Sequence, residues 1–292
     1  MSSLDPTPPA FTPNHTIGIV GLGLIGGCLA LDLRQLGYQV YGVARRKATV
    51  ESALEQGFVD RASCDLDLLT DTRLVFVCTP MAAIVPTIKA LAERLDASTV
   101  VTDVGSVKGE IVAAATDLWP NFVGGHPMAG KAEAGLAAAE AGLFRQRPYV
   151  VTPIATTPPK AMDQVIAIAT QLEAQLYTAT PENHDQAVAA ISHLPVMISA
   201  GLIHTCINDP NDNVRQLAQS LASSGFCDTS RVGGGNPELG TMMAHYNQAA
   251  LLQTLHRYRH QLDKIIDLVD NQQWDTLSTH LSLSQQERPK YL

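Results

Sequence analysis

The chain has 292 residues, of which 46% are hydrophobic and 5% aromatic, and its formal net charge at pH 7 is −8. This length favours two domains over a single core, and the negative charge disfavours a broad nucleic-acid-binding face. The five cysteines form no CxxC pair, so neither a disulfide framework nor a zinc site is predicted, and reduced thiols in a cytoplasmic protein are expected.

Residues 1–14 are rich in Ser, Thr and Pro and contain neither the apolar core of a signal peptide nor an arginine. A segment of this composition buries too little apolar surface to fold, so we expect a flexible tail. Uninterrupted apolar runs of about 18 residues do not occur, so a membrane span is not expected. The sequence therefore favours a protein whose partners are small molecules rather than nucleic acid or membrane.

Residues 15–181 alternate short apolar runs with segments of helical periodicity. The runs are rich in Val, Ile and Tyr, and helix-length stretches separate most of them. This alternation is typical of an α/β fold of Rossmann type, with a doubly wound, mainly parallel sheet covered by helices on both faces. The predicted strands are Ile17–Val20, Gln39–Val43, Leu74–Cys78, Thr99–Thr102, Asn121–Val123, Tyr149–Thr152 and Gln175–Thr178.

Residues 182–292 lack such runs and are predicted to form an all-helical C-terminal domain, with one irregular break at residues 225–237. Beyond the break, apolar residues recur at helical spacing from Leu239 to Leu255. This stripe is interpreted either as the domain's own core or, in part, as a face that packs against a second subunit. Because small domains with long helices often complete their core by dimerising, a homodimer through this domain is expected.

The first predicted strand runs into the motif Gly21-x-Gly23-x-x-Gly26, which a helical segment follows. In this context the motif predicts a dinucleotide site, whereas alone it would indicate only a glycine-rich turn. The first glycine permits a tight turn, the second lets the backbone approach a pyrophosphate, and the third lets the helix pack closely on the strand. The N-terminal turn of that helix, with Leu24 and Ile25, is expected to face the phosphates.

Arg45 and Arg46 follow the second predicted strand, at the place where NAD-dependent enzymes usually carry Asp or Glu for the ribose hydroxyls. Arginine pairs instead with a 2′-phosphate, and Thr49 lies in the first turn of the next helix, where it can add a hydroxyl. The sequence therefore predicts NADP as the cofactor. The alternative is a solvated basic cluster without a ligand.

Polar side chains follow three other predicted strands, at the edge of the sheet where ligands bind in this fold. Thr79 and Pro80 follow one strand, and Asp103 follows the next, so all three are expected at the cofactor. Ser106 comes shortly after and is interpreted either as an N-cap or as a residue that orients a catalytic group. His126 lies between two glycines and a proline, which predicts irregular backbone.

His126 is the strongest catalytic candidate, because oxidising an alcohol needs a base for the hydroxyl proton and imidazole suits that purpose near neutral pH. The alternative is a buried structural histidine. In the helical domain, Arg231 is a candidate clamp for a substrate carboxylate and His193 a candidate pocket residue, although either can be an ordinary surface or core side chain. Pro195 disfavours a smooth helix at His193. His256 and His260 lack a third ligand, so a metal site is not predicted.

Four segments together resemble the prephenate/arogenate dehydrogenases of tyrosine biosynthesis, namely GLGLIGG, the segment from Asp103 to Lys108, GGHPMAG and SHLP. The loop GFCDTSRVGGGNPELGTMM resembles the shorter cyanobacterial arogenate dehydrogenases, and the resemblance runs from about residue 16 to about residue 275. It implies an oxidative decarboxylation in which a hydride leaves ring carbon C4 and the ring carboxylate departs as CO2. It further implies that His126 bonds the 4-hydroxyl and Ser106 orients it, while Arg231, His193 and Gly130 serve the substrate.

One departure concerns substrate choice, since Ala132 stands where many prephenate-preferring members carry Glu, which favours arogenate. The sequence thus predicts an NADP-dependent arogenate dehydrogenase that gives L-tyrosine. Prephenate dehydrogenase is the first alternative, and a β-hydroxyacid dehydrogenase is the second. A non-catalytic NADP-binding sensor would need the glycine loop and Arg45 but not His126, Ser106 and Arg231 together.

Overall fold

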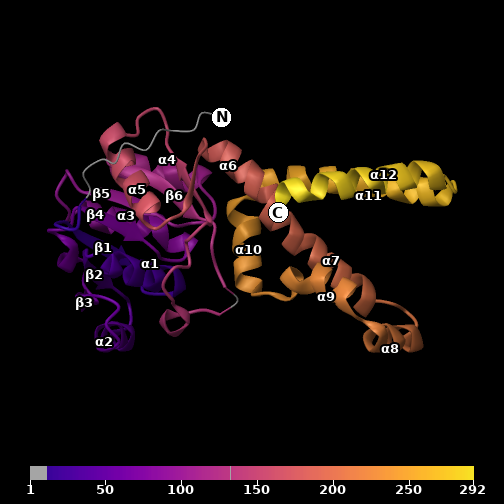
Figure 1. Ribbon diagram of the computed structural model, residues 1–292, viewed down its shortest axis with the longest axis horizontal. Helices are drawn as coiled ribbons and strands as arrows, with labels where there is room; N and C mark the ends of the chain where they lie inside the picture. Colours follow the sequence, from indigo (N-terminus) through magenta and orange to yellow (C-terminus); the bar gives the residue numbers. More distant parts are fainter. Residues whose placement is uncertain (1–11, 132) are drawn as a thin grey trace. The chain divides into compact units, whose positions relative to one another are not determined.

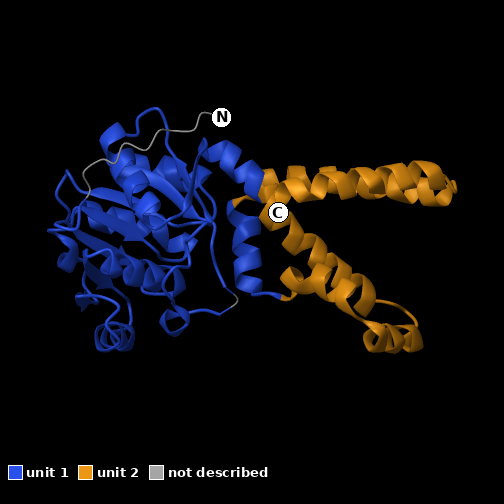
Figure 2. Ribbon diagram, viewed as in Figure 1, with its two compact units in different colours: residues 1–188, 235–246 blue, residues 189–234, 247–292 orange. Residues whose placement is uncertain are grey.

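The computed structural model describes residues 12–131 and 133–292, so residues 1–11 of the predicted tail and Ala132 lie outside the described residues. The chain forms two compact units, coloured separately in Figure 2. Of the described residues, the first unit contains those up to Val188 together with Gly235–Tyr246, and the second contains Ala189–Gly234 and Asn247–Leu292. The predicted boundary after residue 181 stays a prediction.

Within the described residues of the first unit, eight strands form one sheet in the order β3-β2-β1-β4-β5-β6-β7-β8. All neighbouring strands are parallel except β6 and β7. The first six positions follow the strand order of a Rossmann fold, so the predicted fold class is confirmed. The strands are β1 (Thr16–Val20), β2 (Gln39–Val43), β3 (Arg61–Ser63), β4 (Leu74–Val77), β5 (Val100–Asp103), β6 (Phe122–Pro127), β7 (Pro148–Thr152) and β8 (Gln175–Thr178).

Strand β6 differs most from the sequence prediction, which ended it at Val123 and placed His126 in irregular backbone. That placement is wrong, because β6 continues to Pro127 and His126 lies opposite Val150 of the antiparallel strand β7. Pairing with β7 supplies hydrogen bonds that the local sequence, with its two glycines, did not indicate. The short edge strand β3 was also not predicted.

Helices cover both faces of the sheet (Figure 1). Side chains alternate along each strand, so Ile17 and Ile19 join one core with α1, whereas Val75 and Val77 join the opposite core with α3 and α4. The helices of this unit are α1 (Leu24–Gln35), α2 (Lys47–Glu55), α3 (Met81–Ala92), α4 (Gly109–Leu118), α5 (Pro159–Gln171), α6 (Pro181–Val188) and α10 (Pro237–Tyr246), with 3₁₀ turns at Leu66–Leu69 and Leu136–Ala138. Hydrophobic cores on both faces of the sheet thus fix the positions of the carboxyl ends of its strands.

The second unit is helical, as predicted. Its elements are a π-helical turn (Ala189–His193), α7 (Leu194–Ile207), α8 (Asp212–Leu221), α9 (Ser224–Ser230), a 3₁₀ turn (Arg231–Gly234), α11 (Gln248–Asp270), α12 (Trp274–Glu287) and a 3₁₀ turn (Arg288–Tyr291). The predicted break at residues 225–237 is wrong over most of its length, because α9 and a 3₁₀ turn occupy it. A Cβ atom on Gly233 would lie 2.4 Å from the backbone nitrogen of Ala200, so glycine permits the close approach of that turn to α7.

The helical run Pro181–Ile207 contains an 18-residue window with a mean hydropathy of 1.6, so by length and composition it could cross a membrane. Its polar residues, such as Ser192 and His193, interrupt any continuous apolar run, which is why the sequence did not indicate a span. The core helix of a soluble protein can have the same length and composition. The run is therefore weak evidence for a membrane.

Candidate active site

A cavity of about 650 Å³ lies at the carboxyl ends of β1, β2 and β4. This edge of a doubly wound sheet is where such folds bind ligands. Of the predicted cofactor residues, the following line it: Gly21, Gly23, Arg45, Arg46, Thr49, Thr79 and Pro80. The site is thus assembled from segments that follow three neighbouring strands.

Each glycine of the loop has a geometry that a side chain would disturb or fill. Gly21 has a φ of +100°, and a Cβ there would lie 2.6 Å from the carbonyl oxygen of Cys78. A Cβ on Gly26 would lie 2.0 Å from the carbonyl oxygen of Gly21, so only glycine lets α1 pack this closely. A Cβ on Gly23 would meet nothing within 4 Å, which leaves this backbone open to the cavity.

Helix α1 begins directly after the loop, with Gly23 as its N-cap and Leu24 and Ile25 as its first two residues. The N–H groups of a first helical turn have no carbonyl partner within the helix, and the helix dipole adds positive potential there. These groups can therefore bind a pyrophosphate.

The end of β2 gives the cavity a basic side. Arg45 and Arg46 line it together with Thr49 of α2, and none of the described residues that line the cavity is acidic. The adjacent Lys47 is directed elsewhere, since its ammonium lies 3.7 Å from the carboxylate of Glu51. Two guanidinium groups and a hydroxyl fit a ligand that carries a phosphate on its ribose.

Asp103, predicted at the cofactor, is not among the residues that line this cavity. Its side chain is fully buried and pairs with the ammonium of Lys108, which is also fully buried. The carboxylate accepts the N–H of Gly105 at 2.8 Å and that of Gly125 at 3.2 Å, and Lys108 donates to the carbonyl of Gly125 at 2.9 Å. Asp103 and Lys108 thereby tie the end of β5 to β6.

This buried ion pair sets the electrostatics around it. Burial lowers the pKa of the Lys108 ammonium, and the Asp103 carboxylate opposes that change. Burial, reinforced by the Asp103 carboxylate, raises the pKa of Tyr149, a residue that is 1% exposed. Tyr149 therefore stays a neutral phenol beside β6.

His126 is 8% exposed and forms part of a hydrogen-bonded chain. Its Nδ1 lies 2.8 Å from Nε2 of His184, and Nδ1 of His184 lies 2.8 Å from Oδ1 of Asp185. Asp185 also accepts the backbone N–H groups of Lys108 and Gly109 at 2.8 and 2.7 Å, which caps helix α4. His184 and Asp185 were not predicted as site residues, although they are adjacent in the sequence.

Ser106 does not cap α4, because that helix begins at Gly109 with Lys108 as its N-cap residue. The capping interpretation is therefore wrong, and Asp185 provides the acceptors instead. The hydroxyl of Ser106 lies 3.5 Å from the sulfur of Met81, in the turn between β5 and α4. Its side chain is half-buried.

Gly130 lines a separate polar cavity of about 360 Å³ in the same unit, together with Arg145 and Arg147. A Cβ at this glycine would meet nothing within 4 Å. The cavity lies beyond the end of β6, so it begins a few residues after His126 along the chain.

The two remaining predicted residues lie in the second unit. His193 is fully buried at the end of the π-helical turn, and its Nδ1 lies 3.2 Å from the side-chain nitrogen of Asn247. The helix is indeed not smooth here, since the π turn precedes Pro195 at the start of α7. Arg231 is exposed at the start of the 3₁₀ turn that packs on α7.

The Rossmann-type sheet and the glycine loop at its cavity define the class of the protein as a dinucleotide-dependent oxidoreductase. Two family models match the chain: "Prephenate dehydrogenase, nucleotide-binding domain" over residues 29–178 and "Prephenate dehydrogenase, dimerization domain" over residues 180–283. The chain belongs to the prephenate dehydrogenase family. It is an oxidoreductase of the prephenate/arogenate dehydrogenase type with a nicotinamide cofactor, and the resemblance inferred from its motifs is confirmed.

Individual relatives cover nearly the whole chain. The crystal structure of Synechocystis arogenate dehydrogenase is 50% identical, with a TM-score of 0.89, over 95% of this chain and 100% of that one. Cyclohexadienyl dehydrogenase of Zymomonas mobilis is 29% identical over 93% of this chain and 94% of its own length. Prephenate dehydrogenase of Bacillus subtilis is 29% identical over 94% of this chain and 75% of its own length.

Proposed function

We propose that the protein is an NADP-dependent arogenate dehydrogenase that converts L-arogenate to L-tyrosine. The observation that carries the cofactor choice is the basic side of the cavity, where Arg45, Arg46 and Thr49 stand without an acidic residue among the described lining residues. The likeness to Synechocystis arogenate dehydrogenase, at 50% identity, favours arogenate as substrate.

The reaction balances without an additional reactant. NADP⁺, when bound, supplies the acceptor for the hydride that leaves C4 of the cyclohexadienol ring. His126 removes the proton of the 4-hydroxyl, and the C1–carboxylate bond then breaks so that its electron pair completes the aromatic ring. The proton returns from His126 to the phenolic oxygen, so the products are tyrosine, CO2 and NADPH with no net release of protons.

In the proposal, the cofactor is held by Gly21, Gly23 and Gly26 with the first turn of α1, namely Leu24 and Ile25, and by Thr79 and Pro80. Ser106 helps to orient the 4-hydroxyl at His126. We assign Asp103 a supporting part, because its carboxylate is already bonded to Lys108 and to two backbone N–H groups.

The substrate residues are Arg231, His193 and Gly130. A guanidinium forms two parallel hydrogen bonds with a carboxylate, so Arg231 suits the side-chain carboxylate of arogenate. His193 is fully buried and its Nδ1 lies 3.2 Å from the side-chain nitrogen of Asn247, which suits a pocket residue better than a surface one.

Side-by-side kinetics with L-arogenate and prephenate, each with NADP and NAD, test the proposal through the absorbance of the reduced nicotinamide. We expect the highest kcat/KM with arogenate and NADP. A higher kcat/KM with prephenate would assign the alternative activity of the family, and turnover of simple β-hydroxyacids in place of both would overturn the proposal.

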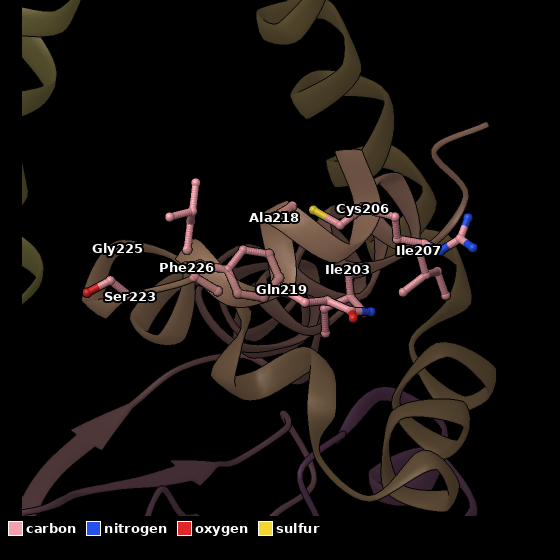
Figure 3. Close-up of a pocket in the computed structure, with 11 residues that line it drawn as sticks. Ile203, Cys206, Ile207, Ala218, Gln219, Ser223, Gly225 and Phe226 are labelled. Atoms are coloured by element: carbon pink, nitrogen blue, oxygen red, sulfur yellow. The ribbon is translucent and has the colours of Figure 1, made fainter. Parts of the chain in front are cut away.

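The proposal includes a homodimer formed through the second unit. This unit exposes large apolar side chains along α8, α11 and α12, and a cavity of about 510 Å³ with apolar lining is open between α7, α8 and α9. Figure 3 shows Ile203, Ala218 and Phe226 at this cavity. Exposed apolar surface of this kind marks an interaction site, and the matching family model is described as a dimerization domain.

Sedimentation equilibrium measures the oligomeric state directly. Wild-type protein should sediment as a dimer, and Leu221→Asp on α8 should weaken that association, whereas the exposed Gln216→Asp on the same helix should not. A wild-type monomer at micromolar concentration would contradict this part of the proposal. We also propose that the protein is cytoplasmic, because the cytoplasm keeps thiols reduced and an NADP-dependent biosynthetic enzyme is expected there.

A further inference from the structure

We propose that His184, held by Asp185, is a positioning residue that fixes the tautomer and orientation of His126. The catalytic role of His184 in this inference rests on the proposed function. The chain of hydrogen bonds from Asp185 through His184 to His126 can be tested without measuring turnover.

The three side chains meet inside the first unit, from two different elements. His126 comes from β6, whereas His184 and Asp185 come from α6, and all three are at most 8% exposed. The two imidazole rings have centroids 5.1 Å apart and planes inclined at 75°. This arrangement brings Nδ1 of His126 to Nε2 of His184. Both contacts in the chain are 2.8 Å long.

The chemistry of the groups gives this chain one direction. The Asp185 carboxylate has acceptors only, so Nδ1 of His184 must donate to it. In a neutral imidazole the other nitrogen is then an acceptor, and Nε2 of His184 therefore accepts from Nδ1 of His126. As a result, His126 carries its proton on Nδ1 and presents the lone pair of Nε2, which is the form that a base for a hydroxyl proton needs.

The same chain also supports the charged form of His126. When Nε2 takes up the hydroxyl proton, the positive charge spreads over the ring, and the Nδ1–H bond to His184 becomes charge-assisted. Asp185 strengthens this bond through His184, because it keeps Nε2 of His184 an acceptor. The arrangement is analogous to a carboxylate that orients a catalytic imidazole, with one further histidine between them.

Asp185 is itself fixed by the backbone. Its Oδ1 and Oδ2 accept the N–H groups of Lys108 and Gly109, which lie at the start of α4 directly after the Ser106 segment. The position of His184 is therefore set by the same turn that carries the expected orienting serine. This coupling distinguishes His184 from a core histidine that only fills space.

Two substitutions separate positioning from packing. His184→Gln keeps an amide that can donate to Asp185 and accept from His126, whereas His184→Leu has a similar volume without either function. His260→Leu, on the exposed surface of α11, is the matched control for loss of a histidine. All three variants are first compared with the wild type by thermal unfolding, so that kinetics are interpreted only for folded protein.

Nitrogen-15 NMR of histidine-labelled protein gives the readout that does not need activity. The His126 signals are assigned by their loss in His126→Asn. In the wild type and in His184→Gln we expect an Nδ1-protonated ring, and in His184→Leu a mixture of both tautomers. An unchanged His126 tautomer in folded His184→Leu would overturn the proposal, whatever substrate the enzyme turns over.

Steady-state kinetics supply the second readout. For His184→Leu we expect kcat to fall by about 10²-fold or more with a KM changed by less than about threefold, since orientation of a base affects the chemical step. The kcat of His184→Gln should be at least about tenfold higher than that of His184→Leu. Equal kcat values for His184→Leu and wild type would overturn the proposal, whereas a wild type inactive on cyclohexadienols but with the expected tautomer would contradict the proposed function alone.

Discussion

Lys108 and Asp103 form an ion pair in which neither side chain is accessible to solvent. Removing one partner leaves the other charge buried without compensation, which typically costs about 3–5 kcal/mol of stability. We therefore expect Lys108→Met to lower the free energy of unfolding by about that amount in denaturant titrations. The exposed Lys160→Met should change it by less than about 0.5 kcal/mol. Equal unfolding midpoints for Lys108→Met and wild type would contradict the expected contribution of the pair.

The basic side of the cofactor cavity predicts how cofactor choice can be altered. Charge-assisted hydrogen bonds are worth about 1.5–3 kcal/mol, so the double variant Arg45→Ala/Arg46→Ala should lower kcat/KM for NADP by about 10- to 10²-fold. Its kcat/KM for NAD should change little. Lys47→Ala is the matched control, because Lys47 does not line the cavity and pairs with Glu51. A strong preference for NAD in both wild type and variant would rule out the proposed 2′-phosphate site.

His126 is expected to act as the base, so replacing it should slow the chemical step more than binding. His126→Asn keeps a polar side chain but cannot accept the hydroxyl proton, and kcat should fall by about 10²–10⁴-fold. The KM should change far less, as measured by the initial rate of nicotinamide reduction across substrate concentrations. A kcat near the wild-type value would exclude His126 as the base.

Arg231 is expected to bind a carboxylate of the substrate. In Arg231→Met the loss of about 1.5–3 kcal/mol of binding should raise KM for arogenate by about 10- to 10²-fold with a smaller change in kcat. Arg259→Met removes an exposed arginine of α11 and should leave both constants near their wild-type values. An unchanged KM in Arg231→Met would count against the clamp.

Asp32 lies 8% exposed on α1, where its carboxylate accepts the N–H of Gly142 at 2.7 Å. Burial raises the pKa of this carboxyl from 3.8, and the Gly142 N–H only partly offsets that effect. The ionised group therefore destabilises the native state above its raised pKa, and the penalty disappears as pH falls through that value towards 3.8. Asp32→Asn should raise Tm at pH 7, and this gain should shrink on acidification. The exposed Asp163→Asn should show no such trend, and a constant gain at all pH values would contradict the explanation.

The sequence predicted the sheet well because β-branched runs and glycine punctuation are local signals. Gln39–Val43 and Gln175–Thr178 have the predicted bounds, and five other strands overlap their predicted runs. The extension of β6 to His126 depends on β7, a partner that the residues around His126 do not reveal. The helical segment from Ser224 to Ser230 contains glycine and short polar residues, which gave it the appearance of a loop.

The residues of the candidate site show the same difference between local signals and contacts that only the fold creates. The glycine loop and Arg45 were identified because spacing along one segment defines them. His184 was not identified, because 58 residues separate it from His126 and only the fold brings their rings together. The position of Asp103 at a strand end predicts a cofactor contact, and this stays a prediction, but the local sequence did not indicate that the buried Lys108 pairs with its carboxylate.

Asp185 begins helix α4 by accepting two backbone N–H groups and, with the same carboxylate, accepts from His184. Protein engineers who wish to alter the basicity of His126 therefore face an asymmetry between two neighbouring positions. Changes at Asp185 alter the start of a helix together with the imidazole chain, so rate and folding yield would decline together. The His184 side chain contacts His126 and Asp185 rather than the N–H groups at the start of that helix, so position 184 is the better site at which to alter the imidazole chain without disturbing α4.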